Sequence, residues 1–204
     1  MPTPPAEVTR PTGRDEVRRA VLDAAVRLFV ERGPASVSLR DIAAEANVNL
    51  GLLYRHFGTK AELLSATVDD LVDRFGAAIA ESVAAPDMPF ELARIVTGTR
   101  DPTMTPMRPY ARMLAWLLLD GVDPASIQSS HPVFPRLVER LLADGRDPTD
   151  ARLTALTIFA VALGWLLYEP YINTAAQLDE VPLDELRGAL ADAFGRLVER
   201  GAQT

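Results

Sequence analysis

The stretch Val37–Lys60, VSLRDIAAEANVNLGLLYRHFGTK, predicts two short helices joined by a tight turn. Ser38 can cap the first helix, and Asp41, three residues later, can hydrogen-bond back to it. Asn47 is of a residue type that tolerates a left-handed backbone, so the first helix can end there. Asn49 can then cap the second helix. Two helices joined in this way form a helix-turn-helix, whose second helix can enter the major groove of DNA.

Apolar positions around this stretch complete a small three-helix module. Leu53 and Phe57 are four residues apart, which turns one face of the second helix toward the interior. An amphipathic pattern over Arg14–Arg32 predicts a further helix that packs behind the motif, and a Gly-Pro pair ends it. We therefore expect residues 14–60 to form the first domain, preceded by a disordered tail at residues 1–13.

Two longer segments carry a family resemblance. LRDIAAEANV (residues 39–48) and LLYRHFGTKAELL (residues 52–64) resemble the DNA-binding module of the TetR family of bacterial transcriptional regulators. The resemblance covers roughly residues 14–75 and implies that Tyr54, His56 and Lys60 hold DNA phosphates, while positions 49, 50 and 52 read bases. The DNA-contacting residues that we expect are Ser38, Arg40, Asn49, Leu50, Gly51, Leu52, Tyr54, Arg55, His56 and Lys60.

Leu50 and Leu52 depart from the pattern, because many relatives carry polar residues at these positions. A leucine cannot hydrogen-bond a base edge, although it can touch a thymine methyl group. Leu50 either seals the edge of the module or contacts DNA, and the first interpretation is favoured. For Leu52 the two interpretations remain open.

The composition excludes several other classes of protein. The net charge is −7, but residues 1–60 hold nine basic against seven acidic residues, so this part can still approach DNA. With no cysteine and only two histidines, we expect no metal site and no cofactor. The chain has neither a P-loop nor a GxSxG motif, so we expect no enzymatic activity. Residues 1–13 contain no apolar run, which predicts a cytoplasmic protein without a membrane anchor.

The remaining residues, 61–204, predict a helical bundle. The expected helices include one from Thr59 to about Ala84, one with an N-cap at Asp147 and a last one at Leu183–Arg200. Leu153–Tyr168 holds no charged residue, which is short for a membrane span of about 20 residues and typical of a buried or interfacial helix. Pro170 should kink or end that helix. The fold expected for the whole chain is all-α, with about nine helices.

The resemblance further implies a ligand-responsive homodimer, most simply a repressor released from a pseudo-palindromic DNA operator by a small apolar effector. Alternatives are a ligand-independent or activating regulator with a filled core and, more remotely, a membrane-surface helical protein. Bulky side chains of two helices are expected to line the effector pocket: Tyr110, Met113, Trp116, Leu117, Phe159, Trp165 and Tyr168. An apolar stripe of the last helix is expected at the dimer interface: Leu186, Leu190, Phe194 and Leu197.

Overall fold

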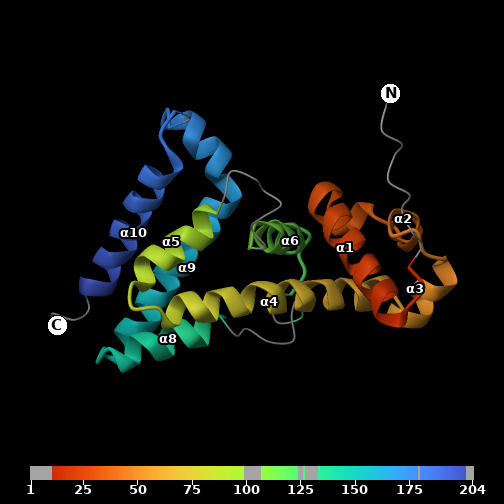
Figure 1. Cartoon of the computed structure of the whole chain (residues 1–204), viewed down its shortest axis with the longest axis horizontal. Helices are drawn as coiled ribbons and strands as arrows, with labels where there is room; N and C mark the ends of the chain where they lie inside the picture. The colour runs from red at the N-terminus through yellow and green to blue at the C-terminus, as the bar shows by residue number, and fades with distance from the viewer. Residues whose placement is uncertain (1–10, 99–106, 124–125, 127–132, 179, 201–204) are drawn as a thin grey trace. The chain divides into compact units, whose positions relative to one another are not determined.

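The computed structural model describes residues 11–98, 107–123, 126, 133–178 and 180–200 (Figure 1). Within these residues the protein has nine α-helices, one short 3-10 helix and no strand, which confirms the all-α prediction. The chain divides into two compact units, Met1–Val68 and Asp69–Thr204. Most of the expected N-terminal tail, residues 1–10, lies outside the described residues.

The first unit contains the predicted three-helix module. Its helices are α1 (Arg14–Arg32), the 3-10 helix η1 (Pro34–Ser36), α2 (Leu39–Glu45), α3 (Leu50–Phe57) and the start of α4 (Lys60–Ala84). Leu63 and Val68 in the first turns of α4 are buried, and the unit extends to Val68. The sequence placed the boundary between the two domains after Lys60, whereas the two units of the structure divide eight residues later, after Val68.

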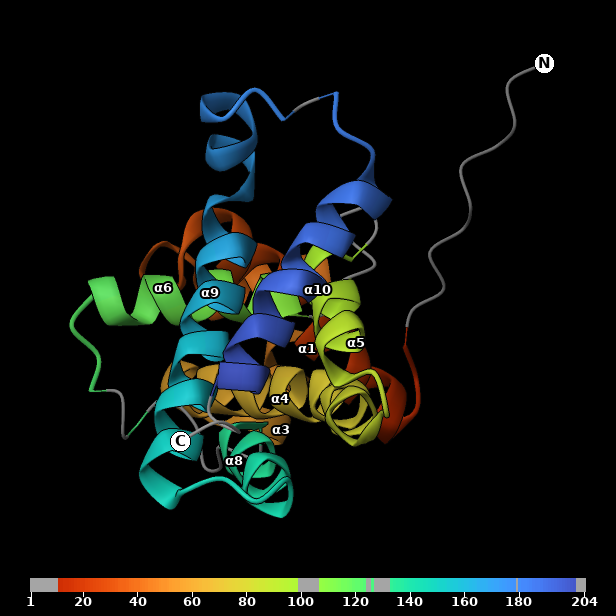
Figure 2. The same cartoon turned by 90° about the vertical axis from the view of Figure 1, so that its left-hand side faces the viewer.

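The second unit contains the rest of α4 and five further helices. These are α5 (Met88–Thr97), α6 (Met107–Leu119), α8 (Val133–Ala143), α9 (Pro148–Ala175) and α10 (Leu183–Arg200). Figure 2 shows α9 and α10 side by side, with α5 packed along α10. Arg187 of α10 fixes this packing, because its guanidinium donates to the Thr97 hydroxyl at 3.3 Å and to the Gly98 carbonyl at 3.0 Å.

Helix α9 continues through Pro170 to Ala175, so of the two outcomes expected at this proline, a kink or an end, the helix does not end. Proline removes one backbone hydrogen bond and costs a helix about 3 kcal/mol. Side chains on both sides of the proline offset this cost. Glu169 accepts from Asn173 Nδ2 at 3.1 Å, one turn further along, and from Arg108 Nη2 of α6 at 2.6 Å. By length and composition alone, α9 could cross a membrane, and 33% of its most apolar window is buried within the protein.

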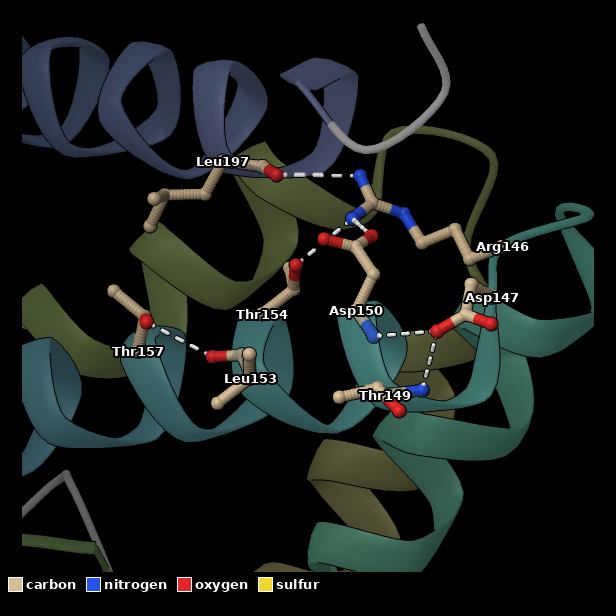
Figure 3. Close-up of polar contacts among 8 residues, drawn as sticks. All are labelled: Arg146, Asp147, Thr149, Asp150, Leu153, Thr154, Thr157 and Leu197. Carbon is tan, nitrogen blue, oxygen red and sulfur yellow. Dashed lines mark hydrogen bonds and ion pairs between the residues drawn. The ribbon is translucent and has the colours of Figure 1, made fainter. Parts of the chain in front are cut away.

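A buried guanidinium joins the start of α9 to the last turn of α10 (Figure 3). The Arg146 side chain, only 2% exposed, precedes α9 in the chain. Its Nη1 donates to Asp150 Oδ2 at 2.6 Å and to Thr154 Oγ1 at 2.8 Å, and its Nη2 donates to the carbonyl of Leu197 at 3.2 Å. The cation thus satisfies a carbonyl in the last turn of α10, where the helix dipole is negative.

Candidate nucleic-acid interface

The helix-turn-helix begins with the predicted capping box. Ser38 Oγ accepts from the Asp41 N–H at 3.2 Å, and Asp41 Oδ2 accepts from the Ser38 N–H at 2.9 Å and from its hydroxyl at 2.6 Å. The hydroxyl and N–H of Ser38 hold the pKa of Asp41 below its usual value. The start of α2 is therefore fixed locally, and Ser38 and Arg40 remain exposed at its surface.

The turn between α2 and α3 also has the expected backbone. Asn47 has φ 54°, in the left-handed region, and the Val48 N–H returns to the Ala43 carbonyl at 2.9 Å. Asn49 Oδ1 accepts from the Gly51 N–H at 2.7 Å and so caps α3. Since all these bonds are local, the direction in which α3 leaves the turn is set by the sequence of the turn itself.

Helix α3 separates an inner from an outer face. Leu53 and Phe57 are buried, as predicted, and the guanidinium of Arg18 in α1 lies 5.3 Å from the centroid of the Phe57 ring. Tyr54 is 53% exposed, and Arg55 is exposed beside it. The other residues expected to contact DNA are exposed (Asn49 and Gly51) or half-buried (Leu50, Leu52 and His56).

Lys60 lies at the start of α4, where a second capping box forms. Glu62 Oε2 accepts from the Thr59 N–H and hydroxyl, each at 2.7 Å, and these bonds lower the pKa of Glu62. The Lys60 ammonium donates one hydrogen bond, to the Ala35 carbonyl at 3.3 Å. An ammonium group has three N–H donors, so two remain for a phosphate. This contact holds the ammonium beside the η1 segment, in the same unit as α3.

The residues predicted to bind an effector differ in how far they are buried. Tyr110, Met113 and Leu117 are buried on one face of α6, and the Tyr110 ring lies 4.7 Å from the ring of Phe75. Trp116 and Tyr168 are 38% and 60% exposed, whereas Trp165 is half-buried. Phe159 is the one member of the predicted set that lines the apolar cavity of the second unit.

That cavity has a volume of about 30 Å³ and lies among α4, α5, α6, α8, α9 and α10. No lining residue has a polar side chain. The lining residues are Ile79, Val83, Leu92, Ile95, Val96, Met107, Val133, Leu137, Ile158, Phe159, Ala162 and Phe194. Sequence reasoning missed most of them because aliphatic residues that line a cavity have the same pattern as those that fill a core.

The residues predicted at a dimer interface divide in a similar way. Phe194 is fully buried in the core of its own unit, while Leu186, Leu190 and Leu197 are half-buried. Sequence reasoning predicted a buried or interfacial helix at Leu153–Tyr168 but did not say which residues of this helix form an exposed apolar face. Its exposed members are Leu153, Leu156, Val161, Tyr168 and Tyr171.

The fold and the α2–α3 geometry define a class of protein, the helix-turn-helix DNA-binding transcriptional regulators. The family model for "Bacterial regulatory proteins, tetR family" matches residues 21–67. The "HTH-type transcriptional repressor Rv3405c" of Mycobacterium tuberculosis is 37% identical over 201 residues, covering 98% of this chain and 99% of the relative. The chain therefore belongs to the TetR family, and it is a DNA-binding transcriptional regulator.

Two further relatives differ more in sequence. The "HTH-type transcriptional repressor KstR" of Mycobacterium tuberculosis is 27% identical over 154 residues, covering 74% of this chain and 70% of the relative. The crystal structure of the multidrug binding protein EbrR complexed with malachite green is 26% identical, with a TM-score of 0.59, covering 88% of this chain and 96% of that one.

Proposed function

We propose that the protein is a cytoplasmic, homodimeric repressor that binds a pseudo-palindromic operator and leaves it when a small, uncharged, apolar effector binds the second unit. The observation that carries the DNA-binding role is the outer face of α3, which presents Tyr54 and Arg55 above a buried Leu53 and Phe57. Tyrosine hydroxyls and guanidinium groups are donors for DNA phosphates and bases. Homologues named as repressors support the direction of regulation.

Dimerisation is supported by the apolar face of α9. Leu153 and Leu156 are 57% and 55% exposed. In a monomer these two apolar side chains therefore contribute much less hydrophobic stabilisation than they would if a second copy covered them. The Thr157 hydroxyl, on the same part of the helix, donates to the Leu153 carbonyl at 2.9 Å. This hydroxyl therefore needs no water, and a second copy can cover the face without leaving an unpaired donor. A twofold dimer also places two α3 helices on successive half-sites of an operator.

Analytical ultracentrifugation tests the dimer. Leu153→Glu and Leu156→Glu place a charge on side chains that are exposed in the monomer, so each variant should fold and sediment as a monomer. Leu119→Glu is the matched control, because Leu119 is 82% exposed on α6 and should leave the dimer intact. If both α9 variants sediment with the wild-type protein as dimers, α9 is not at the interface. If the wild-type protein is itself monomeric, the proposal of a homodimer fails.

The effector site is proposed at the apolar cavity. Its volume of 30 Å³ is far below the roughly 300–1,000 Å³ of ordinary ligand clefts, so a ligand must displace the side chains around it. A charged ligand would lose its hydration without a polar partner in the lining, which favours an uncharged one. The EbrR complex with malachite green supports a small-molecule ligand for a protein of this fold, and not its charge, since that dye is a cation.

The need to expand the cavity is also what makes the ligand a switch. A ligand that binds only an expanded state pulls the population away from the state described here. Moving the protein from mostly DNA-competent to mostly released requires roughly a 10⁴-fold preference, about 5.5 kcal/mol. The two tryptophans, Trp116 and Trp165, both belong to the second unit and can report the change by their fluorescence.

The experiment is a titration with uncharged hydrocarbons and aromatic compounds, followed by tryptophan emission and by release of a fluorescent operator duplex. Ala162→Leu fills the cavity from its wall and should abolish both responses while the protein still binds DNA. Ala143→Leu, at an exposed position of α8, is the control and should respond as wild type. If no compound changes emission or releases DNA, the alternative of a ligand-independent or activating regulator with a filled core is favoured.

The remote alternative of a membrane-surface protein starts from the apolar composition of α9. The inner face of that helix packs in the bundle through Ala155, Ile158 and Leu166, and its outer face suits a second copy. The net charge of −7 would be repelled by anionic lipid. If the protein floats with lipid vesicles, the membrane-surface alternative is supported. If the protein is absent from the lipid fraction, that alternative is excluded.

A further inference from the structure

A hollow of about 380 Å³ lies in the first unit between the start of α1 and α3. We call it the α1–α3 hollow. Its lining residues are Pro11, Thr12, Arg14, Val17, Leu52, Arg55 and His56. Three of them, Leu52, Arg55 and His56, belong to the helix that carries the DNA-binding role, so a ligand in this hollow would touch α3.

The hollow combines apolar side chains with cationic and imidazole groups. Val17 is buried and Leu52 is half-buried, so they provide an apolar wall. Arg14 and Arg55 are exposed, and neither guanidinium is paired with a carboxylate among the described residues. His56 adds a half-buried imidazole.

No acidic residue lines the hollow. The first turn of α1 holds two acids, Asp15 and Glu16, and the second is already engaged. Glu16 Oε2 accepts from the N–H groups of Thr12 and Gly13, at 3.1 and 3.3 Å, and these two bonds lower the pKa of Glu16. Its carboxylate neutralises the start of α1, where the helix dipole is positive, and leaves the two guanidinium groups free for another anion. The hollow therefore favours an anionic ligand that also has an apolar face.

A nucleotide of a DNA strand has both properties. Arginine forks bind phosphate oxygens through two parallel hydrogen bonds, and the imidazole N–H is a further phosphate donor. The C–H face of deoxyribose can pack on a leucine, which cannot hydrogen-bond to the edge of a base. We propose that the α1–α3 hollow receives the sugar-phosphate of one operator strand, with Arg14 and Arg55 on the phosphate and Leu52 against the sugar.

This inference rests on the role of α3 in DNA binding and adds two points to it. First, Arg14 of α1 becomes a DNA-contacting residue, so the strand is held from two helices. Second, Leu52 contributes to position and not to base reading, which accounts for a side chain that cannot hydrogen-bond to the edge of a base. Contacts to the backbone position a protein on DNA and carry no sequence information directly.

The test is a salt titration of DNA binding by fluorescence anisotropy. The probes are a duplex that the wild-type protein selects from a random library and a scrambled duplex of the same length. Arg14→Gln should weaken binding to both duplexes by the same factor and should lower the slope of log K against log salt by about 0.9 per subunit. Arg32→Gln, at the exposed far end of α1, is the matched control and should leave the slope unchanged.

Leu52→Ala tests the second point, because it should weaken both duplexes equally. If Leu52→Ala changes the preferred base at one operator position, Leu52 reads that base and the proposal is wrong. An Arg14→Gln variant that binds like the Arg32→Gln control also overturns it. Tyr54→Phe and Lys60→Ala serve as reference variants. If they too bind DNA like the wild-type protein, the role of α3 in DNA binding fails. If they bind more weakly while Arg14→Gln does not, only the proposal for the α1–α3 hollow is refuted.

A chain lacking residues 2–10 separates DNA from the protein's own tail as the occupant. If the hollow binds a DNA strand, Arg14→Gln lowers the salt slope in the shortened chain by the same amount as in the full chain. If the effect of Arg14→Gln disappears in the shortened chain, Arg14 acts through the tail, and the proposal is overturned.

Discussion

Arg146→Met removes the buried cation that joins α9 and α10 and should be the most destabilising single change at this end of the bundle. Removing one partner of a buried ion pair costs about 3–5 kcal/mol when the other charge stays buried. Here the remaining carboxylate, Asp150, is 37% exposed and can be rehydrated, which lowers the cost. The Leu197 carbonyl and the Thr154 hydroxyl each lose a hydrogen bond from a charged donor. Such a bond contributes about 1.5–3 kcal/mol to stability, from which the desolvation cost of the guanidinium is subtracted.

Together these effects predict a loss of about 2–3 kcal/mol in the free energy of unfolding. For a chain of this length, that loss lowers the melting temperature by roughly 4–12 °C. Denaturant unfolding followed by far-UV circular dichroism measures it. Arg140→Met is the control, because the Arg140–Asp144 pair, at 3.5 Å, is more than a third exposed on both sides and should contribute about 0–1 kcal/mol. A loss below 1 kcal/mol for Arg146→Met, equal to that of the control, would refute the reasoning.

Three further predictions concern the DNA-binding unit. Tyr54→Phe and Lys60→Ala should each weaken DNA binding without changing base preference, as measured on selected and scrambled duplexes, because phosphate contacts do not specify sequence. Asn49→Ala should cost about 1 kcal/mol in thermal unfolding, since the Gly51 N–H loses its cap. Asp41 and Glu62 have lowered pKa values in the folded state, so their capping stabilises fully above the unfolded pKa of about 4 and is lost as pH falls through the folded values. Acid unfolding should therefore begin below about pH 4, and replacing either carboxylate by its amide should flatten this dependence.

The sequence by itself determined the features that depend on neighbours within one turn of helix. Ser38, Asn47 and Asn49 were predicted to cap, end and restart the helices of the motif, and each does so in the structure. The start of α9 after Asp147 was predicted in the same way, and Asp147 Oδ1 accepts from the Thr149 N–H at 2.8 Å. Such bonds join residues two to four positions apart, so the residue types alone carry the information.

Tertiary structure decided whatever depends on which helices meet. An apolar stripe on a helix shows that a face is covered, but not by what, so Phe194 could be assigned to an interface when it is buried in its own unit. The effector residues were chosen for their size, whereas the cavity arises where aliphatic side chains from six helices fail to fill the space between them. Pro170 was judged by its local cost, and the bonds that offset it include one from Arg108, sixty-one residues away in the chain. Leu52 lies beside Arg14 for the same reason, because the distance between two helices in sequence does not set their distance in the fold.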